Sequence, residues 1–343
     1  IVATMDALFS LGIPYREPGL EGWWGEKTVT LNFCEEDYVM NHYVAEVCNT
    51  VTNALFIWLG YRGIGDCIKY SHPWIFFVAF MGYTVVGVGS TFFHATLKCK
   101  FPSVSHSSPR ASPTTVSLSN QQTSDPMQLV DELAMIYTTC FMCYATFSYG
   151  RNKGISAVLG VALAGLSYYI TERYYRTKDP QFHQDAYGIL TAIVVFSNMY
   201  IIERQVRPAL KARQEKRTPN PAIQSADATV NEMWVMVITG LTIFLGGFLA
   251  WNLDNIYCQT ITRWRRQIGL PLAMLLEGHA WWHLMTGIGA YYYISWRVWI
   301  HRCLDGDEDK FQLKWPSVWR LPEVVAIQEL QNGHSGQNGK KHQ

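Results

Sequence analysis

The stretch Glu277-Gly278-His279-Ala280-Trp281-Trp282-His283 places two histidines four residues apart inside an apolar run. On an α-helix, positions i and i+4 lie on one face, so both imidazoles can reach the same point. Such a pair is typical of a divalent metal site. In a soluble helix the pair is more often core packing, but within a membrane an ionisable side chain is unfavourable and usually marks a functional site.

Apolar runs recur along the whole 343-residue chain. Each approaches the roughly 20 residues that cross a bilayer as a helix. Buried helices of a soluble protein could explain one or two of them, but not all seven. The sequence predicts an all-α membrane protein, a seven-transmembrane helix bundle with an intramembrane metal site, with spans near 45–60, 74–97, 128–147, 155–170, 187–202, 233–251 and 272–294.

Charge in the loops predicts the orientation of this bundle. Lysine and arginine are concentrated in the loop after the fifth run and in the tail. By the positive-inside rule, the N-terminus is expected to be lumenal and the C-terminus cytoplasmic. The net charge of +1 argues against a nucleic-acid partner.

The cysteines divide between the runs and the loops. Cys48, Cys140 and Cys143 fall inside runs and are expected to pack as small apolar side chains. Cys34 and Cys258 both fall on the non-cytoplasmic side of the predicted topology. They are therefore a candidate disulfide in an oxidising lumen.

Three further polar residues are expected at the depth of the histidine pair. Ser90 and His94 end the second run four residues apart, and Asp131 opens the third. Because successive helices alternate in direction, these positions and the start of the seventh run lie on the same side. A serine can instead bond its own backbone, and an acid at a helix start can interact with the helix dipole.

Together these residues suggest a reaction centre. His94, His279 and His283 supply three imidazoles and leave a fourth position open, as in a catalytic zinc site. Such a zinc lowers the pKa of bound water towards about 7 and polarises a carbonyl. Asp131 is then the candidate general base and acid, and Ser90 a donor to the developing oxyanion. At membrane depth, the expected substrate is a lipid with an amide or ester bond.

An acidic cluster precedes the first run. It consists of Asn32-Phe33-Cys34-Glu35-Glu36-Asp37 and, further on, Glu46. Acids before a helix can be a favourable N-terminal charge arrangement. Alternatively, carboxylate and carbonyl oxygens converging from one loop can bind calcium.

Segment 99–125 differs in composition from its surroundings, with eight serines, three threonines and three prolines. This composition is typical of disorder. We interpret the segment as an insertion in the lumenal loop between spans two and three, and a retained intron is one hypothesis for its origin. Transcripts that read continuously through it in the mature message would refute the intron. The loop 203–231 is expected to be a solvated linker, and the tail after Arg302 to have no core.

Four separated motifs of this sequence resemble those of the alkaline ceramidases, most closely the fungal type. The family lies within a superfamily of seven-span hydrolases that includes the adiponectin receptors. The resemblance covers roughly residues 20–300 and rests on the acidic segment with the run Ala45-Glu46-Val-Cys-Asn49-Thr-Val-Thr-Asn53, on Ser90-x-x-x-His94, on Gln-Leu-Val-Asp131-Glu-Leu and on His279-x-x-x-His283.

The resemblance implies hydrolysis of ceramide to a sphingoid base and a fatty acid, with catalytic zinc on His94, His279 and His283 and with Ser90 and Asp131 assisting. It also implies a disulfide between Cys34 and Cys258. The family's calcium site maps onto Asn32, the carbonyl of Phe33, Glu35, Asp37 and Glu46. Here the sequence departs from the family, because an acid is usual at position 32 and an amide at position 37. In the family the connection that holds 99–125 is short, so the insertion could affect activity.

The implied organisation has four parts. They are a lumenal N-terminal segment (1–44), a catalytic bundle (45–300), the insertion within it (99–125) and a cytoplasmic tail (301–343). Lys340-Lys341-His342-Gln343 resembles a dilysine retrieval signal, which favours the endoplasmic reticulum or Golgi.

Two other functions compete with ceramide hydrolysis. A receptor of the adiponectin or progestin type would use any metal site for signalling, but such receptors usually have a cytoplasmic N-terminus. A related hydrolase could remodel lipids by cleaving esters, which a comparison of phospholipid and ceramide substrates would distinguish.

Overall fold

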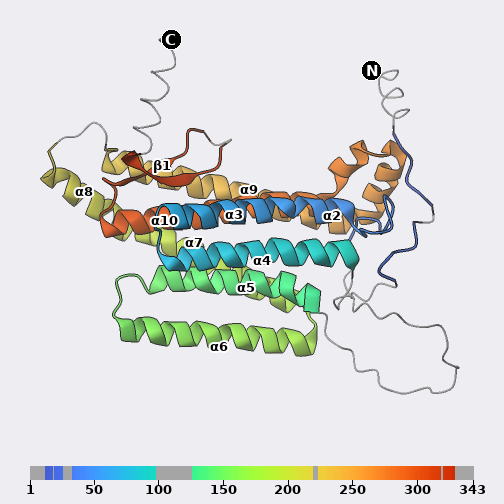
Figure 1. The fold of residues 1–343 in the computed structure, drawn as a ribbon, viewed down its shortest axis with the longest axis horizontal. Coiled ribbons are helices and arrows are strands. Elements are labelled where there is room, and N and C mark those ends of the chain that lie inside the picture. The colour runs from blue at the N-terminus through green and yellow to red at the C-terminus, as the bar shows by residue number, and fades with distance from the viewer. Residues whose placement is uncertain are drawn as a thin grey trace, which may run out of the picture.

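A computed structural model describes residues 12–17, 19–25, 33–97, 126–218, 223–317 and 320–328. These parts of the chain form helices and one β-hairpin (Figure 1). In chain order the elements are α2 (Val47–Thr52), α3 (Ala54–Lys69), α4 (Trp74–Thr96), α5 (Pro126–Phe147), α6 (Lys153–Thr177), α7 (Pro180–Ile201), the π-helix η1 (Ile202–Val206), α8 (Arg207–Lys216), α9 (Ala226–Ile268), the 3-10 helix η2 (Leu272–Leu276), α10 (Gly278–Asp305), β1 (Phe311–Lys314) and β2 (Glu323–Ala326).

All seven predicted runs fall largely in helices. The helices differ in whether their length and apolar composition would let them cross a membrane. Within the described ranges, four helices are long and apolar enough to do so: Trp74–Thr96, Lys153–Thr177, Pro180–Lys216 and Ala226–Ile268. The first predicted run is broken at Asn53, which leaves α3 with 16 residues. The last run is interrupted at Glu277, and its second part belongs to α10, which extends to Asp305 and carries Arg297 and Arg302.

The helices lie side by side along the long axis of the molecule (Figure 1). α4 packs between α3 and α5, while α10 packs along α9. α6 lies at the edge against α5 and α7. Only 6% of the residues in its 18-residue apolar stretch are buried, compared with 50% in that of α4. Val158 and Val161 of α6 expose their side chains, as expected of a surface that faces lipid rather than water.

Local signals set several helix boundaries. The side chains of Asn152, Asp179 and Ser225 accept backbone N–H bonds in the first turns of α6, α7 and α9. Such caps satisfy donors that have no partner within the helix. α9 runs on to Ile268 through a kink at Tyr257, whose backbone is not helical.

Two expectations for the polar segments were wrong. The loop 203–231 is not a plain linker, because η1 and α8 continue α7 to Lys216. The tail is not without a core, because β1 pairs antiparallel with β2 and buries Leu313, Val324 and Val325. Alternation of apolar and polar side chains over 311–314 is the signal for a half-buried strand.

Arg302 ties this hairpin to the loop between α3 and α4. Its guanidinium donates to the carbonyl oxygens of Tyr70 and Ser71 at 3.0 and 2.9 Å, and lies 4.0 Å from the ring centroid of Phe311. It also donates to Nδ1 of His72 at 3.2 Å, which leaves Nε2 of His72 to donate to the carbonyl of Val324 at 3.2 Å. Burial, with a contribution from the nearby Arg302 charge, lowers the pKa of His72 to about 4.

The protein should lose stability in acid through His72. Between pH of about 6.5 and 4, His72 binds a proton in the unfolded chain but not in the folded chain. The free energy of unfolding therefore decreases as the pH is lowered through this range, and it does not change above it. The full loss is about 3 kcal/mol by linkage. Melting temperature against pH in detergent should show this slope, and His72→Gln should flatten it. An unchanged slope in the variant would contradict the assignment.

Candidate active site

Three histidines meet at one end of the bundle. His94 lies in the last turn of α4, and His279 and His283 lie in the first two turns of α10. Their ring centroids are 4.6, 4.9 and 5.1 Å apart. All three side chains are buried, and one nitrogen from each ring lies within 4.8 Å of the others. The structure thus brings together three residues that the sequence separates by 189 positions, from 94 to 283.

A close helix contact sets the start of α10. A Cβ on Gly278 would lie 2.6 Å from Cβ of Asp254 and 2.8 Å from the carbonyl oxygen of Ala250, both on α9. Only glycine allows this approach. The contact fixes the first turn of α10, and with it the position of His279.

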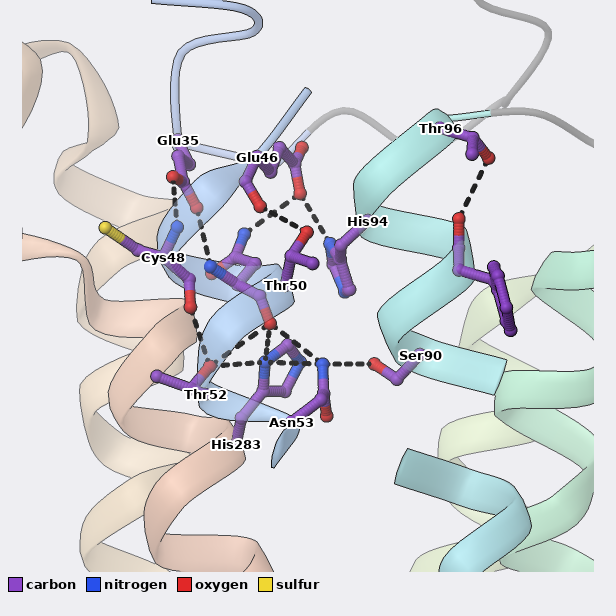
Figure 2. A network of polar contacts seen from close by, with 12 residues as sticks. Glu35, Glu46, Cys48, Thr50, Thr52, Asn53, Ser90, His94, Thr96 and His283 are labelled. Atoms are coloured by element: carbon purple, nitrogen blue, oxygen red, sulfur yellow. Dashed lines mark hydrogen bonds and ion pairs between the residues drawn. The ribbon is translucent and has the colours of Figure 1, made fainter. Parts of the chain in front are cut away.

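Two of the three imidazoles are held from behind through Nδ1. Nδ1 of His94 lies 2.5 Å from Oε2 of Glu46, and Nδ1 of His283 lies 3.0 Å from the carbonyl oxygen of Asn49 (Figure 2). Because a carbonyl only accepts, Nδ1 of His283 carries the proton. Nε2 is then the nitrogen free to bind a ligand in both rings. Nδ1 of His279 is buried and has no hydrogen-bond partner among the described side chains and backbone.

Ser90 and Asp131 lie beside the histidines. Ser90 precedes His94 by one turn of α4 and is buried. Its side chain neighbours that of Asp131. A Cβ on Gly89 would lie 3.2 Å from the backbone nitrogen of Asp131, so α4 and α5 touch here. Asp131 therefore reaches the site although 99–125 separates the two helices; that segment itself lies outside the described residues.

The predicted calcium ligands are only partly gathered. Asn32 lies outside the described residues, and the Phe33 ring packs against His279 with a centroid distance of 4.3 Å. Glu35 accepts the backbone N–H groups of Cys48 and Asn49 at 2.7 and 2.8 Å, and so caps α2. Burial raises the pKa of Glu35 to about 7.

Glu35, Asp37 and Glu46 do not form a single metal-ligand group. In the described chain, the second group of ligand atoms within 4.8 Å of one another is instead Glu35, Cys48 and Glu277. Oε2 of Glu46 lies against Nδ1 of His94. The three acids thus lie in one region without converging on one point.

A disulfide and a buried arginine fasten the N-terminal segment above the site. Cys34 and Cys258, the pair predicted from the sequence, are bonded to each other. Arg265 of α9 is fully buried, forms an ion pair with Glu277 and donates to the carbonyl oxygen of Cys34. Glu277 is the N-cap residue of α10, so this arginine links the N-terminal segment, α9 and the first turn of α10.

The sequence analysis assigned no role to several of these residues. They are Asn49, Asn53, Arg265 and Glu277. The two asparagines carried a signal, because amides four residues apart inside an apolar run share one helix face and need partners when buried. Arg265 and Glu277 gave no comparable signal, since their pairing depends on how α9 packs against α10.

The fold and the site define a helical membrane protein with a buried cluster of three histidines, and comparison with known proteins identifies the family. The family model Ceramidase matches residues 25–325. Alkaline ceramidase 3 of Mus musculus is 33% identical over 311 residues, covering 88% of this chain and 96% of the mouse protein. Alkaline ceramidase YPC1 of Saccharomyces cerevisiae is 30% identical over 299 residues, covering 82% of this chain and 79% of the yeast protein. An alkaline ceramidase of Arabidopsis thaliana is 21% identical over 274 residues, covering 80% and 84% of the two chains.

The chain therefore belongs to the ceramidase family and is a hydrolase of the alkaline ceramidase type, as its motifs predicted. The matched residues include the acidic segment, the three histidines, Ser90 and Asp131.

Loss of the disulfide should loosen the N-terminal segment. We expect Cys34→Ser and Cys258→Ser each to lower stability by about 2–4 kcal/mol, because either change opens the same bond. Melting temperature in detergent measures the effect. The double variant should have the same melting temperature as each single variant. Additive decreases in melting temperature would mean that the two cysteines act independently.

Proposed function

We propose that the protein hydrolyses the amide bond of ceramide, phytoceramide or dihydroceramide, to release a sphingoid base and a free fatty acid. The observation that carries the proposal is the convergence of His94, His279 and His283 at one buried point. Membership of the ceramidase family supports the substrate class.

We assign the three histidines as ligands of a catalytic zinc ion. Three neutral imidazole nitrogens with a fourth position open are the donor set of a catalytic zinc site. The contacts behind the rings fit this assignment, because zinc-binding histidines usually donate their other N–H to a carboxylate or carbonyl. The carboxylate of Glu46 accepts from Nδ1 of His94, and the carbonyl oxygen of Asn49 accepts from Nδ1 of His283. A zinc ion bound here would activate water and polarise the amide carbonyl.

Asp131 is the residue we assign to proton transfer. Its carboxylate lies at the same end of the bundle as the histidines, beside Ser90. As a general base it would take a proton from the attacking water, and as a general acid it would return a proton to the leaving nitrogen. The sphingoid amine then departs and the acyl group leaves as the fatty acid.

The position of the site suits a lipid substrate. The C-terminal end of α4 and the N-terminal ends of α5 and α10 lie together at one end of the helix bundle (Figure 1). We place this end on the lumenal side of a seven-span bundle in the endoplasmic reticulum or Golgi. The four membrane-length helices and the disulfide support that placement.

A calcium ion bound by Phe33, Glu35, Asp37 and Glu46 has weaker support. Both oxygens of Glu35 accept backbone N–H groups, and Oε2 of Glu46 lies on His94 and Asn49. The fifth predicted ligand, Asn32, lies outside the described residues. No step of the proposed reaction depends on this ion.

The function is tested by release of sphingoid base from labelled ceramides by the purified protein. We expect activity that a chelator abolishes, and a loss of about 100-fold or more in His279→Ala, because removal of a metal ligand costs at least as much as removal of its outer partner. His301→Ala is the matched control, since His301 lies on α10 but bonds Asp305 at the opposite end.

Two results would contradict the proposal. One is full activity of His279→Ala. The other is cleavage of phospholipid esters with no cleavage of any ceramide, which would favour the lipid-remodelling function.

Excision of 99–125 should leave the reaction intact. Asp131 already lies beside Ser90 with the segment present. In addition, closing a shorter loop costs less conformational entropy. The expected kcat on ceramide therefore stays within about threefold of the full chain. A large gain on excision would show that the segment obstructs the site.

A further inference from the structure

Asn53 occupies the break between α2 and α3, next to the site. It is the C-cap residue of one helix and the N-cap residue of the other, and its side chain is 1% exposed. The amide nitrogen Nδ2 lies 2.8 Å from the carbonyl oxygen of Asn49, 2.9 Å from Oγ of Ser90 and 3.2 Å from Nδ1 of His283 (Figure 2).

The orientation of this amide is fixed by its neighbours. The carbonyl oxygen of Asn49 can only accept, so the group 2.8 Å from it must be the donor Nδ2. A flipped amide would place two oxygens against each other in a buried setting, which is strongly unfavourable. The second proton of Nδ2 then points to Oγ of Ser90.

Protons around His283 are accounted for without Asn53. Nδ1 of His283 donates to the carbonyl oxygen of Asn49 at 3.0 Å, and the hydroxyl of Thr52 lies 3.2 Å away. Both protons of the Asn53 amide are used by Asn49 and Ser90. Nδ2 of Asn53 and Nδ1 of His283 both donate to the carbonyl oxygen of Asn49. They lie 3.2 Å apart for this reason and need not be hydrogen-bonded to each other.

The donor from Asn53 determines what Ser90 can do. A serine hydroxyl has one proton. Because its oxygen accepts from Asn53, that proton is left for another acceptor, and the neighbouring carboxylate is that of Asp131. The Ser90 proton is thus available to Asp131, whereas the sequence analysis assigned it to the developing oxyanion.

We propose that Asn53 is a positioning residue that aims the hydroxyl of Ser90 at Asp131, and so holds this carboxylate in the orientation for proton transfer. The inference rests on the proposed function of Asp131. It extends the active site to the first predicted span, through the chain Asn53 to Ser90 to Asp131.

A double-mutant cycle in the full-length protein tests the chain of contacts. Asn53→Leu keeps the side-chain shape without its donor, and Ser90→Ala removes the next link. Asn53→Leu should lower kcat on ceramide about 10-fold or more with KM and bound zinc unchanged. In the Ser90→Ala background, Asn53→Leu should lower kcat further by less than about threefold.

A second readout does not need activity. Infrared difference spectra identify the carboxylate band of Asp131 as the one lost in Asp131→Asn. This band should shift in Ser90→Ala, in Asn53→Leu and equally in the double variant, because Ser90→Ala removes the hydroxyl and Asn53→Leu lets it rotate away from the carboxylate.

Asn198→Leu is the matched control. Asn198 is also fully buried, and its amide also donates to the carbonyl four residues earlier and to a hydroxyl, at 2.9 and 3.2 Å from Val194 and Thr146. Its loss should lower the melting temperature but leave the Asp131 band in place.

Three results would overturn the inference: multiplicative losses of kcat in the double variant, loss of zinc in Asn53→Leu, or an Asp131 band that does not move in Asn53→Leu. A wild-type protein that cleaves no ceramide would instead refute the proposed function, and the infrared arm would still decide the role of Asn53.

Discussion

Hydrogen bonds between buried polar atoms at one end of the bundle orient most of the site. Three imidazoles, a serine, an aspartate and two asparagines lie there with little access to water, where each unpaired donor or acceptor costs about 1–3 kcal/mol. The contacts behind His94 and His283 satisfy Nδ1 and turn Nε2 inward. The same contacts that stabilise the fold thus set the orientation of these two histidines.

The first predicted span contributes most of these supporting contacts. Its break at Asn53 leaves a short helix, α2, whose side chains and carbonyls face the site. Glu35 caps that helix from the N-terminal segment, while Arg265 and the Cys34–Cys258 disulfide hold the segment itself. Residues before the first span therefore act on the histidines through packing and hydrogen bonds.

Much of the site could be predicted from local spacing. His279 and His283 share a face because they are one helical turn apart, and the same rule pairs Ser90 with His94. Alternating helix direction predicted that Asp131 would lie at the same end, and the structure places it beside Ser90. The hairpin of β1 and β2 was missed because its strands are short and depend on contacts with Arg302 and the loop between α3 and α4.

The sequence by itself determined the helical character, the family and the candidate site residues, because these depend on local periodicity and on side-chain chemistry. Only the tertiary structure decided which atom of each side chain forms which hydrogen bond or ion pair. The proton on Nδ1 of His283, the hydrogen bond from Asn53 to Ser90 and the pairing of Arg265 with Glu277 depend on partners on other helices or distant in sequence. Hydrogen bonds act over about 3 Å, so such choices are fixed only when packing brings distant parts of the chain together.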